Sequence, residues 1–224
     1  MKNLVLLASM LIGVFTFAQE NEINEVSFAP PRFQSEIFES VNDFLSYHTE
    51  YPAVNKNAGV QGTEIISFKV SVEGKISDFK IVNSVSPEID EEVKSLLLTT
   101  DGKWTAGVAN ETAVEMQKEV SLAFYLNSPG DMVKTAKNHL KKGNHLMYVK
   151  NKPANALKSY NSAALILPND ETILAARILC NYELKDFENA NEDLNRLRIL
   201  SERKGWDSET ETFADLDLFV KNMK

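Results

Sequence analysis

Ala156 and Ala190 lie 34 residues apart, each in a segment whose apolar residues recur at helical spacing. A period of 34 residues is typical of stacked helix pairs, which cannot bury their apolar faces alone and therefore pack on one another. Such segments follow one another between residues 132 and 200. The last part of the chain is therefore predicted to be all helical, in an architecture that usually binds other proteins.

The middle of the chain alternates apolar and polar residues with the period of two that a half-buried strand needs. Residues 66–72 form one such run, Glu73-Gly74 supplies a turn, and residues 76–85 return as a second strand. A third strand is predicted from Val114 to Leu126, with its polar face, residues 115–121, in solvent. The predicted fold class is α+β: a small antiparallel sheet with flanking helices, followed by an all-α helical repeat module.

Two helices are predicted to flank the strands. Residues 34–47 carry an apolar stripe at helical spacing, and Ser86-Pro87 has the form of a helix start, with a capping hydroxyl and a proline in the first turn. The acidic residues that follow, Glu88, Asp90 and Glu91, could suggest a metal or acid-base site. Because negative charge is favoured at any helix start, we interpret them as structural.

Composition divides the N-terminal part further. Residues 1–18 resemble a secretory signal peptide, with Lys2 before an apolar stretch that is too short to span a bilayer. Residues 19–33 are polar and acidic and end in Pro30-Pro31, which predicts a flexible acidic tether. The expected product is an exported protein whose mature chain begins at Gln19.

The breaker at residues 127–130 separates the two predicted domains. We expect the sheet domain over residues 34–128 and the helical repeats over residues 131–224. Apolar residues at helical spacing between Phe213 and Met223 predict a capping helix at the end of the stack, and Trp206 is expected to cover its edge.

Charge is unevenly distributed between these parts. Residues 19–128 contain 8 Lys and Arg against 18 Asp and Glu, whereas residues 129–224 contain 15 against 14. An acidic surface repels phosphate backbones, which argues against nucleic acid as a partner. The acidic residues could equally serve only to keep the protein soluble.

No motif of catalysis or cofactor binding is recognisable in the sequence. Glycine-rich phosphate loops, nucleophile elbows and paired cysteines are missing. His139 and His145 are six residues apart and cannot share one face of a helix, and the single cysteine, Cys180, is expected to be buried. We therefore predict a non-enzyme with no cofactor, no metal and no small-molecule substrate; an enzyme of an unrecognised class is the alternative.

The helical part resembles the tetratricopeptide repeat family over residues 132–202. The residues that carry the resemblance are Gly143, Ala156, Tyr160, Ala163, Pro168 and, in a looser second unit, Ala190. Gly143 lies one residue further from Ala156 than the family pattern requires, which predicts a longer turn between the first two helices. The resemblance implies helix pairs that offer a surface to another protein.

Residues 51–126 resemble the C-terminal domain of TonB, a family of periplasmic energy transducers. The residues that carry the resemblance include Tyr51, Pro52, Gly59, Gly62, Gly74, Asp90 and Trp104. The resemblance implies a small sheet flanked by helices, which binds a short segment of an outer-membrane transporter by strand addition in the periplasm of a Gram-negative envelope. The long Pro-rich reach of the family is missing here, so energy transduction in the strict sense is not expected.

The third predicted strand comes last in its sheet, and a terminal strand can pair with an extended peptide. The candidate protein-binding residues on it are Val114, Glu115, Met116, Gln117, Lys118, Glu119, Val120, Ser121 and Leu122. A protected edge is an equal alternative, because Lys118 interrupts the apolar face and a charge discourages edge-to-edge pairing.

These patterns together predict a periplasmic protein-interaction module with a helical second surface. Its partner would be an outer-membrane transporter or another envelope protein. Two alternatives stay open. In one, an uncut signal anchors the chain to the inner membrane as a transport component; in the other, the protein is structural and binds no peptide. The sequence does not indicate the oligomeric state.

Overall fold

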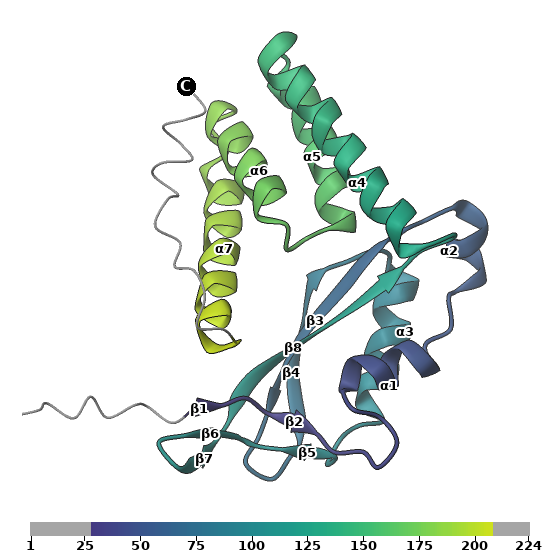
Figure 1. The fold of residues 1–224 in the computed structure, drawn as a ribbon, viewed down its shortest axis with the longest axis vertical. Helices are drawn as coiled ribbons and strands as arrows, with labels where there is room; N and C mark the ends of the chain where they lie inside the picture. The colour runs from purple at the N-terminus through teal and green to yellow at the C-terminus, as the bar shows by residue number, and fades with distance from the viewer. Residues whose placement is uncertain (1–27, 208–224) are drawn as a thin grey trace, which may run out of the picture.

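The structure, a computed structural model, describes residues 28–207, with side chains as far as Glu202. The predicted signal peptide, the capping helix and the side chain of Trp206 lie outside the described residues. The described chain forms a sheet module (residues 28–126) and a helical module (residues 129–207), which lie one above the other in Figure 1. The α+β fold class is confirmed. None of the described helices is long and apolar enough to cross a membrane.

The main sheet has the strand order β4-β3-β8 and is antiparallel throughout. β3 (Gly62–Val70) and β4 (Ile76–Asn83) form the predicted hairpin, and β8 (Met116–Phe124) pairs with β3 along its whole length. One face of this sheet is covered by α1 (Val41–His48) and α3 (Pro87–Leu98), while α2 (Ala53–Ala58) leads into β3.

The two flanking helices begin where a side chain caps them. Ser86 accepts a hydrogen bond from the Ile89 amide at 3.2 Å, which confirms the predicted start of α3. Ser40 does the same for the Asp43 amide at 3.1 Å, so α1 begins at Val41 and not near residue 34. The apolar stripe predicted this helix correctly, but the cap determines its start.

The tether prediction is wrong for its last six residues. β1 (Phe28–Ala29) pairs with β6 (Gly107–Ala109), and β2 (Arg32–Phe33) pairs with β5 (Trp104–Thr105). Each proline of the segment between them costs only one backbone donor, so short edge strands on either side are tolerated.

The predicted third strand is broken in two. Val114 belongs to β7 (Thr112–Val114), which pairs with β6 rather than with β3, and Glu115 lies between β7 and β8. A tight turn joins β6 to β7: Asn110 and Glu111 have φ of 50° and 64°, the left-handed conformation that two-residue hairpin turns require. Val114 and Glu115 are therefore not part of the sheet edge.

The helical module consists of α4 (Pro129–Asn144), α5 (Pro153–Ile166), α6 (Glu171–Glu183) and α7 (Phe187–Asp207). Each helix packs against the next. Close approach is possible because the residues at the contacts are small: Ala156, Ala163, Ala164, Ala176 and Ala190 are all buried.

The extra residue after Gly143 is not in the inter-helix turn. It is absorbed by a π-helical turn, His145–Val149, which continues α4 before the chain turns into α5. A π turn takes one more residue than an α turn, so it restores the register of the two helices. Gly143 then meets the ring of buried Tyr160, where a Cβ atom would lie 2.3 Å from the ring.

Candidate protein-binding edge

β8 is an edge strand of the main sheet. Its residues pair with β3 from Met116, opposite Val70, to Phe124, opposite Gly62. In the part of the chain that the structure describes, no strand pairs with its other side. Because backbone groups of a strand alternate in direction, an edge strand turns about half of its donors and acceptors away from its partner.

The two faces of β8 meet different parts of the molecule. Val120, Leu122 and Phe124 are buried in the core under α1 and α3, so a binding partner could reach only their backbone. Gln117 is exposed on the opposite face, and Glu119 and Ser121 are partly buried there. The expected binding residues Met116 to Leu122 thus lie on one strand.

The prediction that the polar face of this strand lies in solvent is wrong at Glu119. Its carboxylate accepts two hydrogen bonds of 2.7 Å from the guanidinium of Arg196 in α7. Both side chains are almost fully buried, at 9% and 12% exposed, and Asn169 also accepts from Arg196 at 2.6 Å. The helical module is therefore fastened to β8 by a bidentate, charge-assisted pair.

A second contact connects the two modules at the N-terminal end of β3. The hydroxyl of Thr63 donates to the Ile166 carbonyl at 2.6 Å, and the amide of Asn83 donates to the Leu165 carbonyl at 3.3 Å. These carbonyls belong to the last turn of α5, where the helix itself offers no partners. Gly62 permits the approach, because a Cβ there would lie 3.0 Å from the Leu165 oxygen.

Aromatic side chains gather on α1, the helix that packs against β8, and on the residues just before it. Phe38, Phe44, Tyr47 and His48 form contacts with ring centroids 4.6 to 5.5 Å apart. Tyr47 is 76% exposed. Since α3 covers β3 and β4 while α1 covers β8, this aromatic cluster lies on the side of the sheet that ends in the open edge.

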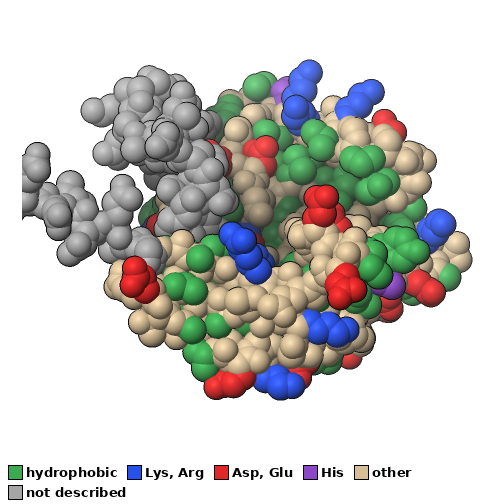
Figure 2. Space-filling view, turned by 60° about the horizontal axis from the view of Figure 1, so that its bottom comes forward, with side chains coloured by type: hydrophobic (Ala, Val, Ile, Leu, Met, Phe, Trp, Pro, Cys, Tyr) green, Lys and Arg blue, Asp and Glu red, His purple; other side chains and the backbone are tan. Residues whose placement is uncertain are grey.

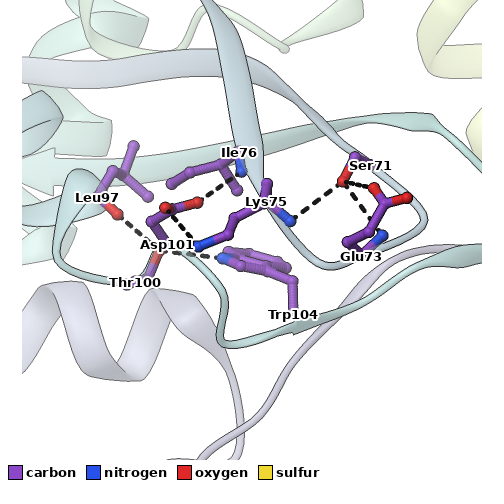
Figure 3. A network of polar contacts seen from close by, with 8 residues as sticks. All are labelled: Ser71, Glu73, Lys75, Ile76, Leu97, Thr100, Asp101 and Trp104. Carbon is purple, nitrogen blue, oxygen red and sulfur yellow. Dashed lines mark hydrogen bonds and ion pairs between the residues drawn. The ribbon is translucent and has the colours of Figure 1, made fainter.

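Trp104 and Gly74 are structural rather than exposed for binding. Trp104 is buried, contacts the rings of Phe33 and Phe68, and donates from Nε1 to Thr100 at 3.0 Å (Figure 3). Gly74 has φ 75°, and a Cβ there would lie 2.2 Å from the Trp104 carbonyl oxygen. A glycine is thus required by conformation and by space.

Asp101 ties the β3–β4 hairpin to the end of α3. It accepts from the Ile76 amide at 3.0 Å and from the Lys75 ammonium at 3.2 Å (Figure 3). The first of these hydrogen bonds, more than the second, lowers the pKa of its carboxyl group. This network fixes the turn but leaves β8 untouched.

Tyr51, Pro52 and Gly59 shape the segment before β3. The Tyr51 hydroxyl donates to the Val60 carbonyl, and its ring meets Phe124 at 5.3 Å. Pro52 precedes the first turn of α2, and Gly59 ends that helix with φ 72°. The motif residues of this segment therefore position the backbone and supply no chemistry.

Asp90 lies beside a buried acid that sequence reasoning missed. Glu64 is 1% exposed; one of its oxygens accepts from the Val85 amide at 2.9 Å, and the other has no hydrogen-bond partner among the described residues. Burial, and secondarily the neighbouring Asp90, raises the pKa of Glu64 to about 8. One signal in the sequence indicated that Glu64 is buried: in the alternating pattern of β3 it occupies an inward position among apolar residues.

The other chemistry-bearing residues form no site. The described residues include no group of three or more His, Cys, Asp or Glu that could hold a metal. Cys180 is buried and donates to the Pro153 carbonyl, and burial raises the pKa of its thiol to about 11. Charged side chains of both signs are interspersed on the face in Figure 2.

The geometry defines a small α+β domain joined to stacked helices; among the described residues, β4 and β8 are the two edge strands of its main sheet, and β8 is the one packed beside α1. Residues 47–126 match the sequence model of the Gram-negative bacterial TonB protein C-terminal family. The structure is similar to the solution structure of the TonB C-terminal domain of Helicobacter pylori, with a TM-score of 0.32 and 15% identity, over 39% of this chain and 91% of that one. No curated protein matches the sequence.

The family match begins in α1 and ends just after β8, so it covers the main sheet and not the helices that follow. The sheet module thus contains the region that is similar to the TonB C-terminal family.

Proposed function

We propose that this protein is a periplasmic interaction protein that captures an extended segment of an envelope partner by strand addition on β8. The observation that carries the proposal is the edge of β8 that no described strand pairs with, inside the region that matches the TonB C-terminal family. The binding stretch is Met116 to Leu122, two residues shorter than the sequence predicts. Main-chain hydrogen bonds would supply affinity and alternate side-chain contacts specificity.

The aromatic cluster on α1 supports this edge as a binding site. An added strand would turn every second side chain toward the face that α1 covers. Exposed aromatic rings such as Tyr47 offer large contact area at small entropic cost, as at many protein interfaces. The partner segment is therefore expected to carry apolar residues at alternate positions.

The helical module is the second interaction surface in this proposal. Its alanine contacts and the fit of Gly143 against Tyr160 support a tetratricopeptide-like stack. The protein would work in the periplasm after export. Intact-mass measurement of the exported protein tests this: a chain that starts at Gln19 supports a cleaved signal, and a retained signal supports the anchored transport component.

The test of strand addition is a peptide titration followed by NMR of the backbone amides. The probe is a synthetic peptide with the sequence of the N-terminal segment of an outer-membrane transporter from the same cell. Shifts confined to β8 and α1 support the proposal. Saturating peptide without shifts in β8, or with shifts only in the helical module, contradicts it.

Proline variants give the matched control. Ser121→Pro and Lys118→Pro remove amide groups that point to opposite sides of β8, because the two positions are three residues apart. The variant that loses the outward amide should keep cooperative unfolding and lose binding at least tenfold, whereas Ser121→Ala should bind as the native protein does. If Ser121→Pro and Lys118→Pro both fold and both bind the peptide with native affinity, the edge of β8 is not used.

A further inference from the structure

A cleft of about 680 Å³ lies between the outer face of the main sheet and the helical module. Figure 2 shows the surface hollowed between the two modules. The sheet contributes Val82 and Met116, the helices contribute Leu174 and Ile199, and Phe28 lies at the N-terminal side. This volume falls in the range of sites that hold a ligand or an inserted segment.

The cleft suits an amphipathic occupant, because its apolar residues lie beside polar ones such as Lys80 and Glu192. Its two arginines are already paired: Arg196 with Glu119, and Arg177 with Asp193 through hydrogen bonds of 2.9 and 2.5 Å. Paired charges offer little attraction to a charged ligand. Val82, 37% exposed at the edge of the sheet, adds apolar surface that the joint between the modules leaves uncovered.

We propose that residues 208–224 of this chain fold back into the cleft as an amphipathic helix. The segment follows α7 directly, and Ile199 and Glu202 near the end of α7 already line the cleft. Its sequence places Phe213, Leu216, Phe219, Val220 and Met223 at helical spacing. Its 17 residues would span about 26 Å as a helix, which is long enough to cross a small domain.

The outward face of α7 is a poorer site for the same segment. Its exposed residues include Asn191 and Arg198, which offer no apolar cover for a helix stacked as a further repeat. Residues 19–27 are another candidate, since they precede Phe28, which lines the cleft, but Ile23 and Val26 are their only large apolar residues. The C-terminal segment therefore fits the cleft better in apolar content.

Docking of this segment would complete the joint between the modules. Burial of several large apolar side chains stabilises the folded state, and a stack of two helix pairs is fewer than the three that usually bury a continuous core. The docked segment would also cover the outer face of β8 but would leave the unpaired backbone edge of β8 free. This inference does not rest on the proposed strand addition.

Photo-crosslinking in the full-length protein tests the proposal. p-Benzoylphenylalanine replaces Lys80, an exposed residue that lines the cleft, and in a control it replaces Lys56, an exposed lysine on α2 outside the cleft. After irradiation and trypsin digestion, the Lys80 position should be joined to the peptide of residues 205–221, at least tenfold more than the Lys56 position. Mixing labelled and unlabelled chains shows whether the link is within one chain.

A second pair of variants keeps the test independent of folding. In the Lys80 crosslinker background, Phe219→Asp should reduce the link at least fivefold, and Phe219→Leu should preserve it. Links to residues 19–27, links between two chains, or equal links from positions 80 and 56 would each overturn the proposal.

Discussion

The sheet module and the helical module bury their interiors with opposite kinds of side chain. The core of the sheet module is one cluster of large residues, with Trp104, Phe68 and Leu45 among its members. The helical module has several smaller clusters, and alanines such as Ala156, Ala163 and Ala190 lie at their closest contacts. A core of large residues is sensitive to truncation, whereas a core of small residues is sensitive to enlargement.

Truncation of Trp104 should have the largest effect. Trp104→Ala removes contacts with Phe33 and Phe68 and leaves a cavity under the β3–β4 turn, so the free energy of unfolding should fall by roughly 3–5 kcal/mol. Urea unfolding measures the loss. Tyr47→Ala, an aromatic truncation at a side chain 76% exposed, is the control and should change stability by less than about 0.5 kcal/mol. Equal losses at the two positions would contradict a core role for Trp104.

Truncation of the Arg196–Glu119 pair, which joins the two modules, should have nearly as large an effect on stability. Arg196→Ala leaves the buried Glu119 carboxylate without its cation, and the free energy of unfolding should fall by about 3 kcal/mol. Arg198→Ala breaks a pair with Glu202 whose side chains are 61% and 51% exposed, and should cost less than about 0.5 kcal/mol. If both variants unfold alike, the pair does not hold the modules together.

Enlargement of an alanine tests the other half of the comparison. Ala163→Leu inserts a branched side chain into a fully buried contact between α5 and its neighbours, and should destabilise by about 1–3 kcal/mol. Ala154→Leu, on the exposed side of the same helix, should be close to neutral. Thermal unfolding of the two variants gives the comparison, and a stable Ala163→Leu protein would show that the helices can separate to admit a larger residue.

Local signals in the sequence predicted most of the elements. The Ser86-Pro87 start, the Glu73-Gly74 hairpin and the four helices after residue 128 each depend on residues close in sequence. The pairing of Val114 with β6 was missed because the left-handed turn at Asn110 and Glu111 carries no strong signature without a glycine.

The candidate site was predicted only in part, because local patterns in the sequence do not reveal long-range contacts. The strand that forms the edge follows from its alternating pattern, but its cover by Arg196 does not, because that residue lies 77 positions further along the chain. Glu64 was missed as well: a carboxylate is normally exposed, and only the packing of β3 shows that this one is buried. Long-range contacts therefore decide which edge residues are accessible.

Besides Glu119, two acids are buried among the described residues, Glu64 and Asp193, and only one of these two has a cation. Asp193 in the helical module is paired with Arg177, whereas Glu64 in the sheet module has only the Val85 amide and neighbouring Asp90. Burial is the main cause that raises the pKa of Glu64 to about 8 in the folded protein, from an ordinary value near 4.5. Between these two values the folded state binds more protons than the unfolded state, so stability falls as the pH rises through this window and levels off above it.

Glu64→Gln should remove this pH dependence. Between pH 7 and pH 8 the free energy of unfolding of the native protein should fall by about 1 kcal/mol, while that of the variant should stay constant over the same range. Glu91→Gln, at an exposed position of α3, is the control and should follow the native protein. Urea unfolding at both pH values measures the difference. An unchanged slope in Glu64→Gln would show that Glu64 is ionised in the folded protein at neutral pH, and that the sheet module tolerates a buried charge without a cation.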